Sequence, residues 1–119
     1  MYKFLNRNPL NKKLPDCVCR AISLALRIPY GEVMEMLYDN GDCYNCDELT
    51  VNCYSKMLTD MGLKSVDAGD RTVAELCSDY PDNIILARLE GHLTCCVNGD
   101  CYDIWDCTGE KADKFWIVG

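Results

Sequence analysis

The sequence of 119 residues contains no glutamine, a single histidine and no long apolar run. A helix that crosses a membrane needs about 20 consecutive apolar residues, and no segment of this chain approaches that length. Residues 1–16 also lack the uninterrupted apolar core of a signal peptide, because charges and prolines break it. We therefore expect an intracellular, cytoplasmic protein with no membrane partner.

Positive charge is also scarce, since 12 lysines and arginines face 19 aspartates and glutamates, which gives a net charge of −7. A surface that binds nucleic acid usually needs a basic patch to neutralise phosphates, so we expect no nucleic-acid partner. The acidic balance suits solubility or docking to a basic protein surface. The length fits one domain over residues 1–119, with residues 1–15 as an extended lead-in.

Cysteine is abundant, with ten in the chain. In an exported protein this number would indicate a disulfide framework, but without an export signal we interpret most of them as reduced thiols that pack as small hydrophobic side chains. Cys43 and Cys46 form a C-x-x-C pair near Cys53, which is half of a zinc site, and no second pair completes it. We expect no metal and no cofactor, and a thiol or zinc module at these cysteines is an alternative.

Periodicity and capping residues predict helices in the first half of the chain and strands in the second. The expected helices cover about residues 17–28, 30–39, 51–61 and 73–80. The expected strands cover residues 63–66, 84–89, 92–97, 101–105 and 115–118, with a tight hairpin turn at 98–99. Helices followed by an antiparallel sheet indicate an α+β fold.

The single histidine, His92, is the natural candidate for a general base near neutral pH. A two-residue turn at 98–99 places Thr94 opposite Asp103 on the paired strand. Because side chains alternate along a strand, His92 and Asp103 then share one face and lie diagonally, within reach of a hydrogen bond. Asp103 is the expected orienting carboxylate. Asp106 falls on the other face unless a bulge intervenes, and is the alternate.

The start of a helix lowers the pKa of a thiol, and Cys17 directly follows Asp16, the expected N-cap of the first helix. Cys53, in the first turn of the third helix, is the next candidate nucleophile, and Cys19 points to the opposite side. Arg20, one turn after Cys17, is expected to pair with Asp16 or with a carboxylate at the edge of the core, or to help keep Cys17 ionised. A nucleophile at a helix start, with a base and an orienting acid on later strands, is the logic of a catalytic triad.

Three segments, DCVCRAISLAL at 16–26, GHLTCCVNGDCYDIWDCT at 91–108 and the terminal KFWIV, resemble a family of small phage and bacterial proteins with a papain-like fold. The resemblance implies a papain-like cysteine peptidase core, in which N-terminal helices pack on a C-terminal antiparallel sheet. It also implies that Cys17 is the nucleophile, His92 the base and Asp103 the acid of a phage-encoded hydrolase. Its substrate would be a peptide, isopeptide or amide bond, cleaved in the cytoplasm of the host cell.

Papain-like enzymes place a side-chain donor for the oxyanion, often glutamine, shortly before the nucleophile. Without glutamine, Asn11 or Asn8 is expected to take that role. A missing donor costs roughly 2.7–4 kcal/mol of transition-state stabilisation. The alternative function is therefore a catalytically idle acidic phage protein that binds and inhibits a host factor.

Overall fold

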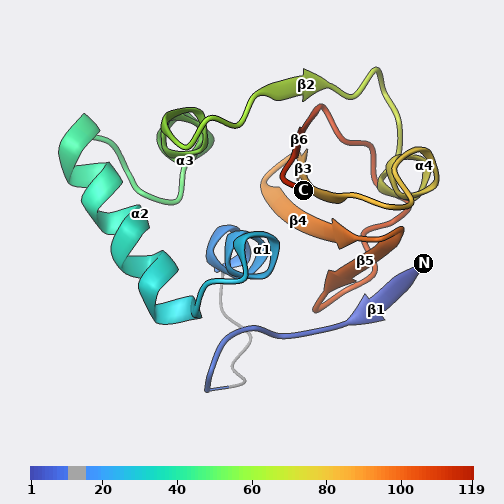
Figure 1. The fold of residues 1–119 in the computed structure, drawn as a ribbon, viewed down its shortest axis with the longest axis horizontal. Helices are drawn as coiled ribbons and strands as arrows, with labels where there is room; N and C mark the ends of the chain where they lie inside the picture. The colour runs from blue at the N-terminus through green and yellow to red at the C-terminus, as the bar shows by residue number, and fades with distance from the viewer. Residues whose placement is uncertain (11–15) are drawn as a thin grey trace.

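The computed structural model describes residues 1–10 and 16–119, and within them the chain forms an α+β fold of four helices and a six-stranded mixed sheet (Figure 1). The helices are α1 (Cys17–Leu26), α2 (Tyr30–Tyr44), α3 (Val51–Asp60) and α4 (Val73–Asp79). The strands are β1 (Tyr2–Phe4), β2 (Ser65–Asp67), β3 (Ile84–Leu89), β4 (His92–Val97), β5 (Asp100–Asp103) and β6 (Lys114–Ile117). Their order in the sheet is β1-β5-β4-β3-β6-β2. The predicted fold class, α+β, is confirmed.

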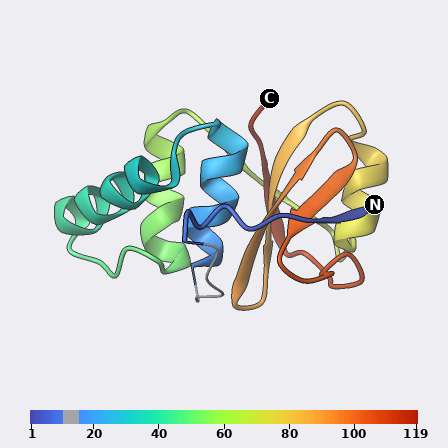
Figure 2. The same cartoon turned by 90° about the horizontal axis from the view of Figure 1, so that it is seen from below.

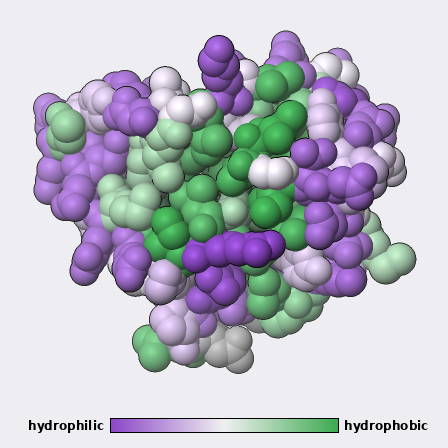
Figure 3. Space-filling view, in the orientation of Figure 1, coloured by the Kyte–Doolittle hydropathy of each residue, from purple (hydrophilic) through white to green (hydrophobic). Residues whose placement is uncertain are grey.

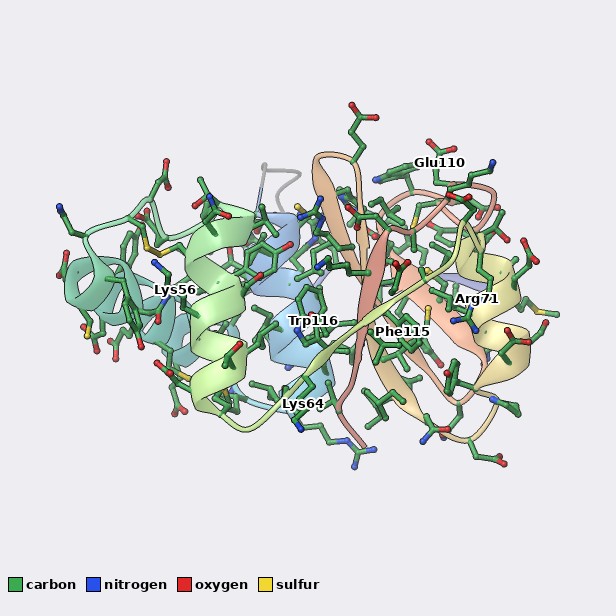
Figure 4. All side chains as sticks on the ribbon, turned by 90° about the horizontal axis from the view of Figure 1, so that it is seen from above. Lys56, Lys64, Arg71, Glu110, Phe115 and Trp116 are labelled. Carbon is green, nitrogen blue, oxygen red and sulfur yellow. A yellow bond between two sulfur atoms is a disulfide. The ribbon has the colours of Figure 1, made fainter. Side chains whose placement is uncertain are left out.

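Helices cover both faces of the sheet, with α1, α2 and α3 on one side and α4 on the other (Figure 2). Phe115 and Trp116, which are neighbours on β6, point to opposite sides of the sheet (Figure 4). Trp116 packs in the apolar core under α1, and Phe115 packs in the core under α4. Cys95 and Cys96 are both buried for the same reason, since consecutive strand residues alternate between two covered faces.

The large hydrophobic side chains that remain exposed come from helices, strands and loops throughout the chain, from Met1 to Ile117. On the face that Figure 3 shows, hydrophobic residues gather in the middle, along the junction between the helices and the sheet, and hydrophilic residues form the rim. Among the described residues, no helix is both long and apolar enough to span a membrane.

The central hairpins have the predicted strands. Both β3 and β4 have the predicted bounds, and Val97 lies opposite Asp100 as the two-residue turn requires. Asn98 and Gly99 have φ angles of 50° and 84°, and a type I′ turn needs positive φ at both positions. Strand β5 ends at Asp103, two residues before the predicted end.

The C-terminal strands β3, β4, β5 and β6 pair antiparallel as predicted, but the whole sheet is mixed. Tyr2–Phe4 was expected to belong to an extended lead-in, but it forms β1, which pairs in parallel with β5 at the edge of the sheet. Lys3 forms an ion pair with Asp100 at 3.1 Å across this edge. A strand of three residues is too short for its alternation to be recognised in the sequence.

Helix α2 continues to Tyr44, whereas the sequence predicted a helix over 30–39 that ends before Asn40 and Gly41. Asn40 is buried, and its side-chain amide donates a hydrogen bond of 2.8 Å to the carbonyl oxygen of Cys53. A Cβ at position 41 would lie 2.9 Å from the carbonyl oxygen of Cys46. The two residues therefore allow close packing against the following loop instead of terminating the helix. The helix ends at Tyr44, and its C-cap residue, Asn45, has a left-handed backbone conformation.

Gly41→Ala is expected to destabilise the protein, although alanine favours a helix by about 1 kcal/mol. The carbonyl of Cys46 must move to admit the new methyl group, which costs about 1–3 kcal/mol. Gly31→Ala in the same helix is the matched control, because a Cβ there meets nothing within 4 Å. Thermal unfolding followed by circular dichroism should give a lower Tm for Gly41→Ala than for Gly31→Ala, and equal values would contradict the close approach.

A disulfide joins Cys46 to Cys53, and so links the loop after α2 to the first turn of α3. The other eight cysteines are free thiols, as predicted for most of them. Cys53 is thereby removed from the candidate nucleophiles. The C-x-x-C pair is also divided, because Cys43 stays an exposed thiol while Cys46 is bonded elsewhere.

Candidate active site

Cys17 and His92 lie close together because the start of α1 and the turn between β3 and β4 lie at the same end of the molecule (Figure 2). Cys17 is the first residue of α1, and its half-buried thiol lines the same hollow as His92, whose imidazole acts on the thiol electrostatically, as does the backbone of Leu93. The first N–H groups of a helix have no acceptor within the helix, so this end presents partial positive charge to the sulfur.

The other side of the imidazole is bound by Asp103, as the parity of the hairpin predicts. His92 Nε2 lies 2.6 Å from Asp103 Oδ2, and the aspartate is only 5% exposed. The second carboxylate oxygen accepts a hydrogen bond of 2.7 Å from the backbone N–H of Ile104. Because Nε2 is held by Asp103, Nδ1 is the ring nitrogen left for Cys17. The imidazole therefore joins a thiol to a buried carboxylate.

The electrostatics favour a thiolate–imidazolium pair. Burial by itself would raise the pKa of the Cys17 thiol, but hydrogen bonds from His92 and the Leu93 backbone, with the charges of His92 and Arg20, lower it overall. Burial would likewise lower the pKa of His92, but its hydrogen bonds to Asp103 and Cys17 raise it to about 9. At neutral pH the imidazole therefore carries its proton, and the lowered pKa of the Cys17 thiol favours a negative sulfur beside it.

Asp103 stays ionised although it is buried. Desolvation would raise the pKa of its carboxyl group, but hydrogen bonds from His92, Thr94 and the Ile104 backbone lower it below the ordinary range. The guanidinium of Arg20 adds an ion pair, with Nη2 3.6 Å from Asp103 Oδ1. The carboxylate is thus able to hold the imidazolium in one orientation.

Asp16 does not cap α1 with its side chain, which corrects the prediction from the sequence. Its carboxylate instead contacts the Arg20 guanidinium and accepts hydrogen bonds from the side chains of Asn8 and Tyr30. A charged guanidinium is a stronger partner for a carboxylate than a backbone N–H. The expected pairing of Arg20 with Asp16 is present, and the contact with Asp103 comes in addition.

Asp106 and Asn8, two of the alternate site residues, have hydrogen-bond partners outside the group of Cys17, His92 and Asp103. Asp106 is exposed, and its carboxylate accepts hydrogen bonds from the backbone N–H and hydroxyl of Thr108. Asn8 donates its side-chain amide to Asp16 at 3.1 Å, so this group is already used. Asn11 lies outside the described residues. The structure thus brings together Cys17, His92 and Asp103. It identifies no side-chain donor for an oxyanion among the described residues.

The site opens into a hollow of about 370 Å³. Its lining includes Cys17 and His92, together with Leu49, Ile104 and Trp105. Trp105 is 43% exposed, and its ring centroid lies 5.2 Å from that of His92. A bound chain could therefore contact the thiol and the imidazole from solvent.

Sequence reasoning missed Cys107, whose thiol lies 3.7 Å from Asp103 Oδ2. Among the described residues, His92, Asp103 and Cys107 form the one group whose ligand atoms could hold a metal ion, within 4.8 Å of one another. Ligand atoms around zinc stand roughly 3.3 Å apart, given metal–ligand bonds of about 2.0 Å. The 2.6 Å contact between His92 and Asp103 fits a direct hydrogen bond better than a metal centre.

The single histidine allows a direct test of these electrostatics. We expect the imidazole proton resonances of His92 to titrate near pH 9 in solution NMR. Asp103→Asn should lower this pKa by at least about one unit, since it removes the nearest negative charge. Below this pKa the imidazolium is a proton donor, and it becomes neutral as the pH rises through about 9. A titration near 6.5, the ordinary value for histidine, would contradict this account.

Comparison with known protein families, with curated proteins and with solved structures finds no match to this chain.

Proposed function

We propose that the chain is a small papain-like cysteine hydrolase that cleaves a peptide, isopeptide or amide bond. The observation that carries the proposal is the position of His92, which is hydrogen-bonded to a buried carboxylate and shares a hollow with a thiol at a helix start. The resemblance of segments 16–26 and 91–108 to small phage proteins supports the same assignment.

Each residue has a defined role in this reaction. The Cys17 thiolate attacks the carbonyl carbon of the substrate, and the carbonyl oxygen takes the negative charge. His92 then gives its proton to the leaving amine, the carbon–nitrogen bond breaks and a thioester to Cys17 remains. His92 next removes a proton from water, and the water oxygen attacks the thioester carbon. The carbon–sulfur bond then breaks, which releases the acid and restores the Cys17 thiolate beside the imidazolium. Asp103 holds the imidazole in one orientation through both steps.

The start of α1 provides the positive side of the oxyanion site. The backbone N–H groups of Cys17 and Val18 belong to the first turn, which has no acceptors within the helix. An oxyanion formed beside the Cys17 sulfur would lie near these donors and the helix dipole. No side-chain donor is assigned among the described residues, since Asn8 is bonded to Asp16.

The hollow indicates how a substrate would lie. An extended peptide bound in the hollow would contact both Cys17 and His92, which line it together with Leu49 and Trp105. His92 and Trp105 also line a second hollow of about 120 Å³, which adjoins the imidazole and extends to Glu110 and Lys111. Because His92 protonates the leaving amine, the part of the substrate after the scissile bond belongs on this side.

The second candidate function is a catalytically idle acidic protein that binds and inhibits a host factor. One observation favours it, namely that the Asn8 amide, a candidate oxyanion donor, is committed to Asp16. The two functions differ in turnover, since an idle protein would retain the fold and the ion pair and cleave nothing.

Peptide cleavage separates the two candidates. The protein is incubated at pH 7 with a diverse peptide mixture, and new termini are counted by mass spectrometry against Cys17→Ala as the matched control. The hydrolase predicts cleavage products that are absent with Cys17→Ala. If neither peptides nor branched isopeptides are cut by the folded wild-type protein, the hydrolase proposal is wrong.

A further inference from the structure

We propose that Arg20 is a positioning residue of the catalytic site, which holds Asp103 so that one carboxylate oxygen stays directed at His92. This inference rests on the proposed function, because it concerns the same site. It adds a fourth residue to the machinery and gives a chemical reason for the spacing of Asp16, Cys17 and Arg20.

The geometry places the guanidinium between two buried carboxylates. Arg20 is 6% exposed, and it lies one helical turn after Cys17 on α1. One of its terminal nitrogens, Nη1, contacts Asp16 on the same helix. The other, Nη2, lies 3.6 Å from Asp103 Oδ1, on β5. The side chain therefore connects the helix that carries the nucleophile to the strand that carries the orienting acid.

The two oxygens of Asp103 have separate partners as a result. Oδ1 faces Arg20 and the Ile104 N–H, while Oδ2 accepts the bond from His92. A planar guanidinium with a fixed fork of donors can hold two carboxylates at once, which a single ammonium group cannot do with the same geometry. Without it, the Asp103 carboxylate could turn away from the imidazole.

Arg20 is itself held in place by Asp16. Asp16, its partner on the helix, also accepts hydrogen bonds from the Asn8 amide at 3.1 Å and from the Tyr30 hydroxyl. A chain of polar contacts thus runs from Tyr30 through Asp16 and Arg20 to Asp103. If Arg20 only neutralised Asp16, its second terminal nitrogen, Nη2, would not need to reach Asp103 on β5.

The test compares four folded variants by the rate at which iodoacetamide alkylates Cys17 at pH 6, and by kcat/KM on the cleaved peptide. The variants are Arg20→Met, Arg20→Lys, Asp16→Asn and the double variant Asp16→Asn/Arg20→Met, each first checked by circular dichroism. The double variant removes one charge of each sign, so it separates neutralisation of Asp16 from positioning of Asp103. Cys43, an exposed thiol, is the internal reference for reagent reactivity.

The positioning role predicts that Asp16→Asn, which weakens one contact of Arg20 and leaves its contact with Asp103, loses less in alkylation rate and in kcat/KM than Arg20→Met. Arg20→Met and the double variant should both lose at least about tenfold in alkylation rate, which corresponds to a shift of one pH unit in thiolate formation. Arg20→Lys should recover only part of this loss, because the charge remains while the fork is absent. Arg20→Lys should also lower the pKa of the His92 imidazole, as measured by NMR.

Two other outcomes have distinct meanings. Wild-type reactivity in the folded double variant would overturn the positioning role and assign Arg20 to Asp16 alone. If Arg20→Met does not fold, the double variant and Arg20→Lys still decide between the two roles. Wild-type Cys17 that is alkylated no faster than Cys43 would instead remove the proposed function, and this inference with it.

Discussion

Cys17→Ala is expected to abolish turnover, with a loss of about 10⁴-fold or more in kcat/KM, because no other thiol can attack from its position. The residual rate would come from binding and oxyanion stabilisation alone. The protein should remain folded, since Cys17 is only half-buried. The measurement is kcat/KM on the peptide identified by the cleavage screen.

Cys19→Ala is the matched control on the same helix. Cys19 is fully buried, and burial raises its pKa to about 12, so it stays protonated at neutral pH. Its substitution should reduce stability by about 1 kcal/mol and leave kcat/KM within about threefold of wild type. The assignment fails if Cys19→Ala removes activity while Cys17→Ala keeps it.

Asp103→Asn should lower kcat/KM by about 10²–10⁴-fold. An asparagine can present its amide to the imidazole in place of a carboxylate, and it no longer stabilises the imidazolium. The substitution also leaves Arg20 beside a neutral side chain in a buried position. The effect should therefore appear both in kcat and in the pH at which the basic limb of kcat/KM falls.

Asp106→Asn distinguishes this account from the alternate orienting acid. Asp106 is exposed and bonded to Thr108, and its replacement should change kcat/KM by less than about threefold. Equal losses in Asp103→Asn and Asp106→Asn would show that neither carboxylate is specifically coupled to His92.

The hairpin was predictable because local rules decide it. Asn98-Gly99 fixes a two-residue turn, and the turn fixes the register of β4 against β5. The alternation of side chains then places His92 and Asp103 on one face. In the same way, Thr72 and Glu75 predict the start of α4, where they form a capping box.

The features that the sequence did not reveal depend on contacts between distant segments. Strand β1 exists because the N-terminus meets the free edge of β5, and three residues carry no pattern of their own. The side chain of Asp16 leaves its capping position because Arg20, Asn8 and Tyr30 converge on it. Asn40 serves in helix packing because Cys53 lies against it. Tertiary contacts override local preference in each of these cases.

The central claim is that His92 activates Cys17, and selective alkylation tests it most directly. Wild type and His92→Ala are treated with substoichiometric iodoacetamide at pH 6, and the modified cysteines are located and quantified by mass spectrometry. The account predicts that Cys17 is modified first in wild type, ahead of the exposed Cys43, and that His92→Ala abolishes this preference. Slow, uniform modification of the exposed thiols in both proteins would contradict it.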